Sequence, residues 1–170
     1  MEDLEQKAGG QGPVLSKDDI DYYQNLKETL SSHVCRNCRN KRLESFSQML
    51  MTIRYFVERK KEDDWKRSLL CGICWYKYYV CVNIKQMTYL LEKCKSSING
   101  SLQRLGYLTN PSHAESWKMF ISKIPFLKDN YNELRQWTIR CKNNPFPPVL
   151  PVEVNLVPIQ PIQPYIQSYS

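Results

Sequence analysis

Apolar side chains recur at intervals of three and four residues through most of this chain, which is the spacing of one face of an α-helix. The clearest stripe predicts a helix from about Arg42 to Glu58 and consists of Leu43, Phe46, Leu50, Ile53 and Val57. Comparable stripes predict further helices, which would begin near Ser16, Asp63, Ile84, Lys95, Ser112 and Asp129. The expected fold class is therefore mainly α.

The expected helices differ in where they end and in what they bury. The first would bury Ile20 beside Tyr23, and the third in chain order would continue through Ile73. The last would run as far as Cys141. Only the segment YYVCVN (78–83) has the alternation and β-branched content of a strand. We therefore expect a minimal β-sheet.

Residues 84–106 have the layout of a helix–turn–helix: a short helix, a tight turn and a second helix. Asn83 can cap the first helix, and Gly106 can stop the second. One side of the second helix is apolar and would pack inward, with Cys94 beside Ile98, Leu102 and Leu105. The YYVCVN strand and the segment Gly106–Ser112 would supply a strand and a wing. Together these elements predict a winged helix-turn-helix with a minimal β-wing.

The opposite side of the second helix carries only small or hydrogen-bonding residues, namely Ser96, Gly100 and Gln103 flanked by Ser97, Asn99 and Arg104. Asn and Gln can bond bidentately to adenine, Arg to guanine, and Ser to several groups. A glycine in mid-helix costs stability, and it is useful where a large surface must approach the backbone closely. A solvated face usually favours Glu, Lys and Ala, which are absent here. The pattern favours reading of double-stranded DNA over an ordinary solvated face.

The net charge of +7 is concentrated in the middle of the chain. Residues 33–61 carry eight Lys or Arg against two Asp or Glu, whereas acids exceed bases in residues 1–32. A basic middle between acidic or neutral ends is expected of a phosphate-binding surface. The same charge would also keep a domain soluble, so it suggests a polyanion without identifying one.

Three segments follow from the composition along the chain. Residues 1–16 resemble a flexible leader, residues 17–144 the folded domain, and residues 145–170 a proline-rich linker or tail that holds most of the ten prolines. No apolar run reaches the length of a membrane span, and the acidic N-terminus is not typical of a secretory signal. The seven cysteines are therefore expected to be reduced thiols inside a cell. Without a heptad seam we expect a monomer.

The blocks KCKSSINGSLQRLGY (93–107) and KDNYNELRQWTIR (128–140) resemble the initiator-binding domain of trichomonad transcription-initiation proteins, a winged-helix family. RNKRLESFSQML (39–50) and DDWKRSLLCGICW (63–75) resemble further blocks in the same order. The resemblance spans roughly residues 17–145. It implies nuclear binding to the core-promoter initiator element at the transcription start site. In that family a proline-containing linker leads to a C-terminal domain implicated in contact with RNA polymerase II. The tail here, or such a domain, would be the route to the transcription machinery.

The resemblance places Lys95, Ser96, Ser97, Asn99, Ser101, Gln103 and Arg104 on or near the helix that enters the major groove. We expect base reading by Ser96, Ser97, Asn99, Gly100, Gln103 and Arg104. Contacts to the DNA backbone are expected from Lys95, Ser101, Arg36, Arg39, Lys41 and Arg42. Backbone contacts set the register of the protein on the duplex without specifying sequence.

Cys35–Cys38 and Cys71–Cys74 form two CxxC pairs, a pattern that can hold zinc through four thiolates. Cys71 and Cys74, however, lie in an apolar stripe, where cysteine commonly serves as a small buried hydrophobe. We expect no metal and no cofactor. The sequence contains no HExxH, no GxSxG and no phosphate-binding glycine loop, so we expect no enzyme activity. The alternatives to DNA binding are a protein-interaction adaptor and a zinc-stabilised regulatory module.

Overall fold

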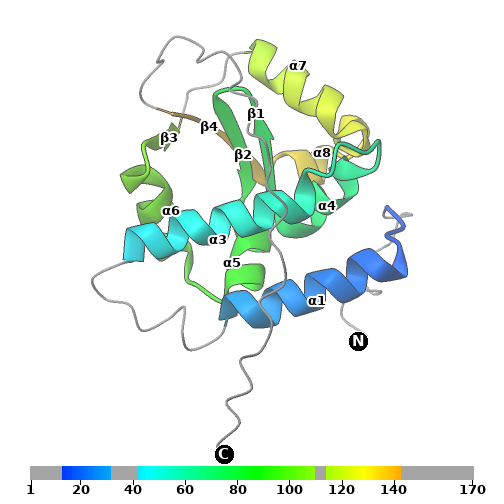
Figure 1. Cartoon of the computed structure of the whole chain (residues 1–170). Coiled ribbons are helices and arrows are strands. Elements are labelled where there is room, and N and C mark those ends of the chain that lie inside the picture. The colour runs from blue at the N-terminus through cyan, green and yellow to red at the C-terminus, as the bar shows by residue number, and fades with distance from the viewer. Residues whose placement is uncertain (1–12, 32–41, 110–113, 143–170) are drawn as a thin grey trace, which may run out of the picture.

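Helices surround a small antiparallel sheet in the computed structural model, which describes residues 13–31, 42–109 and 114–142 (Figure 1). The elements are α1 (Lys17–Ser31), α3 (Arg42–Val57), α4 (Asp64–Cys71), β1 (Ile73–Tyr76), β2 (Tyr79–Asn83), α5 (Ile84–Leu91), α6 (Lys95–Arg104), β3 (Tyr107–Thr109), α7 (Ala114–Lys123), the 3-10 helix η2 (Pro125–Lys128), α8 (Tyr131–Leu134) and β4 (Trp137–Lys142). The mainly helical class predicted from the apolar spacing is confirmed. None of the helices in these ranges is long and apolar enough to cross a membrane.

The sheet of the described residues has the strand order β1-β2-β4-β3, with every neighbouring pair antiparallel. The predicted strand at 78–83 is confirmed as β2, but three further strands join it. β4 is central, because Arg140 lies opposite Val80 of β2 and opposite Thr109 of β3. Segments that are distant in sequence thus meet in one sheet.

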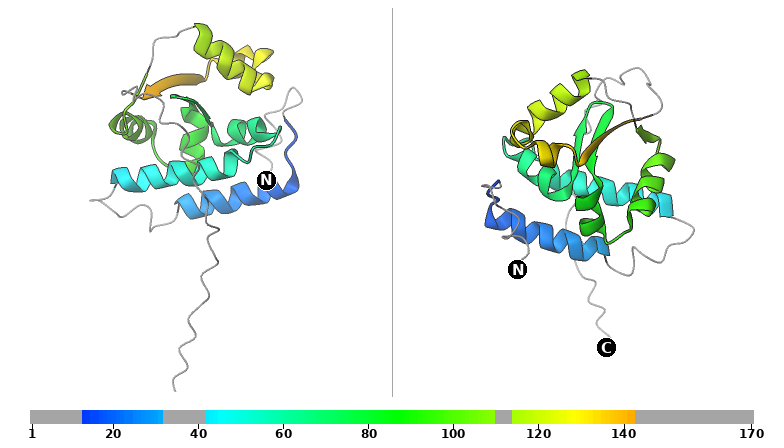
Figure 2. Two further views of the ribbon diagram at one scale, coloured as in Figure 1. Left: turned by 45° about the horizontal axis from the view of Figure 1, so that its top comes forward. Right: turned by 180° about the vertical axis from the view of Figure 1, so that it is seen from behind.

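Helices cover both faces of this sheet (Figure 2), and one apolar cluster lies on each face. The first, here the helical cluster, joins α1, α3, α5 and α6 to one face and includes Leu26, Phe46, Ile53, Val80, Val82, Met87, Leu90, Ile98 and Leu102. The second, here the α7 cluster, packs α7 and η2 on the other face and includes Cys74, Cys81, Phe120, Leu127, Trp137 and Ile139. Alternate residues of a strand point to opposite faces, so β2 contributes to both clusters.

The third helix ends at Cys71 and does not continue through Ile73, contrary to the prediction. Gly72 adopts a left-handed conformation with φ +73°, and its N–H donates to the Ser68 carbonyl at 2.9 Å. A Cβ at Gly72 would lie 2.5 Å from the Cβ of Gln86 and 2.8 Å from the Asn83 oxygen. Only glycine fits this close approach to the start of α5, and the chain then enters β1.

The predicted last helix from Asp129 to Cys141 is also wrong. α8 spans only Tyr131–Leu134, and residues 137–142 form β4. Trp137 and Ile139 point into the α7 cluster, while the strand pairs with both β2 and β3. β4 thus bonds to a neighbour on each side, and its alternate side chains Trp137 and Ile139 reach the same apolar cluster.

The first helix is capped as predicted, since the Asp19 N–H donates to the Ser16 hydroxyl at 3.1 Å. Ile20 is 41% exposed, however, and Asp19 is buried in its place, so that prediction is wrong. The Asp19 carboxylate receives Arg67 and Arg59, each at 3.0 Å. Arg67 also pairs with Asp63 at 3.0 Å and with Asp64. This buried ion cluster attaches α1 to α4.

Candidate nucleic-acid interface

α5 and α6 form the helix pair predicted for residues 84–106. The Asn83 side chain accepts from the Gln86 N–H at 3.3 Å and donates to Glu133 Oε1 at 3.3 Å, so it both caps α5 and attaches it to α8. Gly106, with φ +88°, follows the end of α6 and leads into β3. The predicted short helix, turn and second helix are confirmed.

α6 is divided into a buried and an open side, as its sequence predicts. Ile98 and Leu102 are fully buried, and Leu105 is partly buried. On the other side four polar side chains are exposed: Ser96, Ser97, Gln103 and Arg104. A Cβ built at Gly100 meets no atom within 4 Å. Packing within the domain therefore does not require the glycine, and the face around it is open to a large partner.

Asn99 is half-buried at the edge of this face, and its Oδ1 accepts a hydrogen bond of 2.6 Å from Nη2 of Arg140. Arg140 lies in the middle of β4 and is 8% exposed. Its Nη1 donates to the Tyr107 carbonyl at 3.4 Å. The sheet thus supports one of the predicted base-reading side chains from beneath α6.

Two residues of this region do not lie where the sequence suggested. Ser101, expected to contact the DNA backbone, is buried, because it lies one turn beyond Ile98 on the inner side of α6. Its hydroxyl receives Arg104 Nη2 at 3.5 Å, and its burial argues against the predicted contact to the DNA backbone. Cys94, expected beside the inner face, is exposed at the N-cap position of α6.

The N-terminus of α6 stabilises negative charge. The pKa of the Cys94 thiol is lowered by a hydrogen bond from the Ser96 hydroxyl and, next, by the Ser97 N–H. The groups that stabilise a thiolate there can equally donate to a phosphate oxygen, and exposed Lys95 adds a positive charge beside them. This end of α6 is therefore suited to a contact with the DNA backbone.

The basic residues expected at the DNA backbone, between Arg36 and Arg42, lie almost entirely outside the described residues. Arg36, Arg39 and Lys41 lie outside the described residues. Arg42 begins α3, and its side chain lies outside the described part as well. Their assignment to backbone contacts stays a prediction.

Arg140 is not among the predicted site residues, because the sequence pattern predicts a helix through residue 140 where the structure has β4. The β-branched pair Thr138–Ile139 next to Trp137 was the available signal for a strand. That signal is short, and it shows neither which strands flank β4 nor that position 140 lies under α6.

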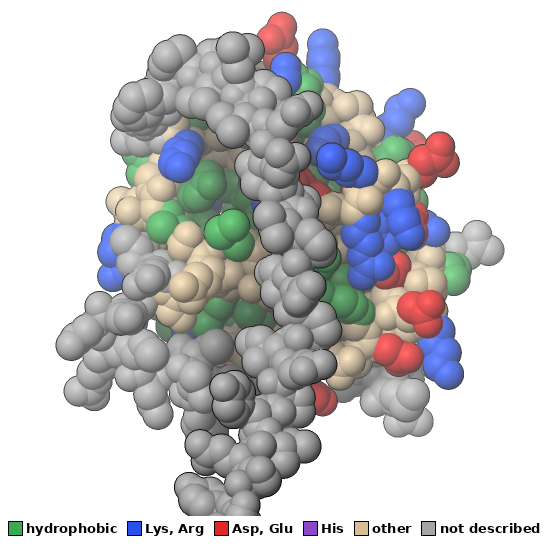
Figure 3. Space-filling model, in the orientation of Figure 1, with side chains coloured by type: hydrophobic (Ala, Val, Ile, Leu, Met, Phe, Trp, Pro, Cys, Tyr) green, Lys and Arg blue, Asp and Glu red, His purple; other side chains and the backbone are tan. Residues whose placement is uncertain are grey.

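The visible charged side chains of both signs gather toward the right in Figure 3, on the side of α1, α4 and α7. α6 lies toward the left in the same view, and its sequence contains no acidic residue. The exposed face of α6 itself therefore carries no carboxylate that would repel a polyanion.

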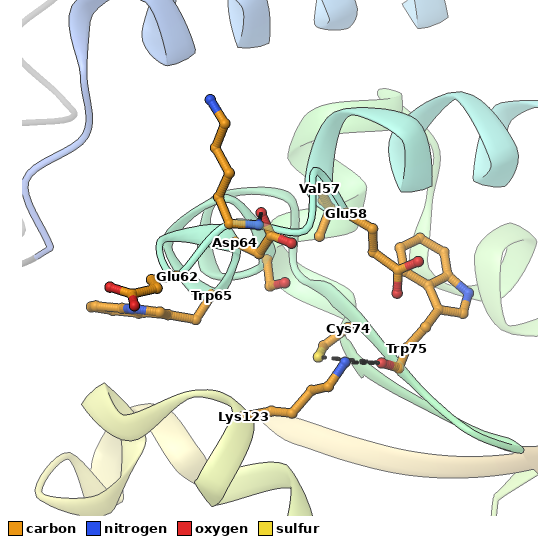
Figure 4. A pocket seen from close by; sticks show the side chains of 10 residues that line it. Val57, Glu58, Glu62, Asp64, Trp65, Cys74, Trp75 and Lys123 are labelled. Atoms are coloured by element: carbon orange, nitrogen blue, oxygen red, sulfur yellow. Dashed lines mark hydrogen bonds between the residues drawn. The ribbon is translucent and has the colours of Figure 1, made fainter.

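A pocket of about 210 Å³ lies at the C-terminal end of α3, between α4, β1 and α7 (Figure 4). Trp65, Trp75 and Cys74 line it, and Lys123 donates to the Trp75 carbonyl at 3.0 Å. α6 packs toward the opposite end of α3 (Figure 1). The pocket is therefore separate from the face of α6.

The two described cysteines of the CxxC pairs lie on different faces of the sheet. Cys71 belongs to the helical cluster and Cys74 to the α7 cluster. Burial raises the pKa of both thiols, which opposes the thiolate forms that zinc requires. Cys35 and Cys38 lie outside the described residues. Within the described ranges no three His, Cys, Asp or Glu side chains gather around a possible ion.

A helix pair whose second helix exposes an acid-free, hydrogen-bonding face is typical of a DNA-binding domain. The sequence model of the transcription-initiator DNA-binding domain IBD matches residues 17–144, most of the chain. The chain belongs to this family, which confirms the resemblance seen in the sequence. It is a family of DNA-binding domains and not of enzymes, and membership implies DNA binding in transcription initiation. Comparisons with curated proteins and with solved structures found no match.

Proposed function

We propose that this chain recognises the initiator element of core promoters in the nucleus, by placing α6 in the major groove of double-stranded DNA. The observation that carries the proposal is the open, acid-free side of α6 around Gly100. A helix with its side chains is about 10–12 Å across, and the major groove is about 12 Å wide, so close approach of the backbone favours base contacts.

The connectivity supports a winged-helix scaffold for this proposal. Six elements occur in the order helix, strand, two helices and two strands, namely α4, β2, α5, α6, β3 and β4. In the sheet β4 lies between β2 and β3. This is the order expected of a winged helix. β1 adds an edge strand, and α7, η2 and α8 occupy the connection between β3 and β4, where a simple wing would lie. The scaffold presents α6 at one side of the molecule (Figure 1).

The side chains of α6 divide into two roles under this proposal. Base edges would be read by Ser96, Ser97, Asn99, Gln103 and Arg104, with Gly100 allowing the approach. Lys95, the first-turn N–H groups and the basic residues Arg36, Arg39, Lys41 and Arg42 would bind phosphates. Phosphate contacts give affinity for any duplex, whereas the exposed side chains of α6 discriminate between sequences.

A selection of bound duplexes from a random pool, with the full chain as bait, tests the proposal directly. We expect a defined motif to be enriched, and enrichment of no motif would contradict sequence-specific binding. A shortened chain ending at residue 144 distinguishes DNA binding from the protein-interaction adaptor. If the proposal is correct, the shortened chain binds DNA about as tightly as the full chain. An adaptor is favoured if neither chain binds DNA and if only the full chain binds a partner protein.

Two substitutions distinguish base reading from phosphate binding. Gln103→Ala should weaken the selected duplex by about 1–3 kcal/mol and leave a scrambled duplex almost unchanged. Arg39→Ala should weaken both duplexes alike and lower the salt dependence by about one ion. Fluorescence anisotropy at two salt concentrations measures both effects. Gln24→Ala is the control, because exposed Gln24 lies on α1, away from α6 (Figure 1). It makes the same chemical change and should leave the affinity for both duplexes unchanged. Equal losses on both duplexes from Gln103→Ala would contradict base reading.

A further inference from the structure

Arg140 is a buried cation without a counter-charge among the described residues. It is 8% exposed, and its Nε has no hydrogen-bond partner in the described ranges. Burial lowers its pKa, and no carboxylate in the described part of the chain opposes that effect. Burying an unpaired charge is costly, so a side chain of this kind is rarely retained for packing alone.

The other buried arginine shows what a structural role looks like in the same domain. Arg67 is 1% exposed and pairs with three carboxylates, those of Asp19, Asp63 and Asp64. Within the described residues Arg140 has two neutral acceptors instead, the Tyr107 carbonyl at 3.4 Å and Asn99 Oδ1 at 2.6 Å. The shorter of the two contacts is the one to the side chain on α6.

The chemistry of this contact decides how Asn99 is oriented. A guanidinium has donors and no acceptor, so the Asn99 amide must turn its oxygen toward Arg140. Its Nδ2, which carries two hydrogens, is then the group left for another partner. Asn99 is half-buried, and exposed Gln103 lies one turn further along α6. The amide therefore connects the buried guanidinium to the open face.

We propose that Arg140 is a positioning residue for DNA recognition, which holds Oδ1 of Asn99 so that Nδ2 donates to the N7 acceptor of a purine in the major groove. The inference rests on the proposed function and deepens it. A free asparagine reads adenine bidentately, with its oxygen accepting from N6 and its nitrogen donating to N7. With the oxygen engaged by Arg140, the remaining donor fits N7, which both purines present. The expected preference at that base pair is therefore purine over pyrimidine, with little choice between adenine and guanine.

The test uses the full chain and the duplex that the wild type selects, with each purine replaced in turn by its 7-deaza analogue. We expect one position at which the replacement weakens wild-type binding roughly tenfold. Asn99→Ala should lose a similar factor on the normal duplex and be insensitive to the analogue at that position. Arg140→Met should do the same, and the double variant should bind no more weakly than either single variant.

A merely structural role for Arg140 predicts a different result. Arg140→Met would then lower the melting temperature and weaken all duplexes alike, and this variant would keep the wild-type pattern of analogue sensitivity. That result would overturn the inference. If Arg140→Met does not fold, the wild type keeps the test intact. Exchange of adenine for guanine at the sensitive position should leave its affinity nearly unchanged, because Oδ1 of Asn99 is engaged by Arg140. A strong preference for adenine would mean that Oδ1 is free to accept from N6, and it would overturn the role of Arg140.

The failure of the inference can be distinguished from failure of the proposed function. A wild type that prefers no duplex contradicts the proposed function. A wild type that prefers one duplex, with an analogue sensitivity that Asn99→Ala leaves in place, contradicts only the role of Arg140 and Asn99.

Discussion

Replacing Gly100 with alanine should make the domain more stable and make it bind DNA less well. Alanine in a helix interior is favoured over glycine by about 1 kcal/mol. No clash offsets this gain, because a Cβ at position 100 meets no atom within 4 Å. For a domain of this size the gain corresponds to a rise in melting temperature of about 3–6 °C.

The same methyl group should oppose binding, because the proposed complex brings DNA against the backbone at Gly100. Extra bulk in a close-packed contact typically costs about 1–3 kcal/mol, or roughly 5- to 150-fold in affinity. Thermal unfolding followed by circular dichroism gives the first quantity, and anisotropy with the selected duplex gives the second. Stability and affinity are thus expected to change in opposite directions.

Ser122→Ala on α7 is the matched control for Gly100→Ala. It also introduces alanine at an exposed helical position, and Figure 1 places α7 away from α6. It should alter stability slightly and leave DNA affinity unchanged. A Gly100→Ala variant that binds the selected duplex as tightly as wild type would refute the close approach of DNA to α6. A fall in its melting temperature would refute the account of Gly100 as an unpacked helix position.

Two further predictions concern stability. Arg67→Met should cost about 3–5 kcal/mol in urea unfolding, because it removes a partner from the buried Asp19 carboxylate. Arg54→Met, which breaks the exposed pair with Glu58, should cost less than about 1 kcal/mol, and similar losses from the two variants would contradict the account of the buried cluster. Burial raises the pKa of the Cys71 thiol above its ordinary value of 9.0, so above pH 9 the unfolded chain loses a proton that the native chain keeps. The free energy of unfolding should then fall by up to about 1.4 kcal/mol per pH unit for this thiol. Urea titrations between pH 8 and 10.5 measure this slope, and Cys71→Ala should reduce it. An unchanged slope in the variant would contradict the effect of burial on this thiol.

The features predicted correctly from sequence are those decided by neighbours along the chain. The cap at Asn83 depends on an amide three residues away, and Gly106 lies two residues beyond the end of α6. The division of α6 into an apolar and a polar side follows from helical periodicity alone. Such features need no knowledge of what packs against them.

The errors occurred where a distant segment decided the local structure. Gly72 ends α4 in a turn that packs against the start of α5, so the apolar stripe that continues to Ile73 was misleading. Asp19 is buried in place of Ile20 because Arg67, far along the chain, supplies its counter-charge. β4 is a strand because β2 and β3 are present on either side of it.

By itself, the sequence determined the helical class, the α5–α6 pair and the acid-free outer side of α6, because hydrophobic spacing and capping act over a few residues. Only the tertiary structure placed Arg140 beneath α6 and turned the amide of Asn99 toward it. Arg140 and Asn99 are 41 residues apart, and their contact exists only because β4 pairs inside the sheet. A hydrogen bond over that separation depends on the packing of the whole domain, which no local pattern in the sequence encodes.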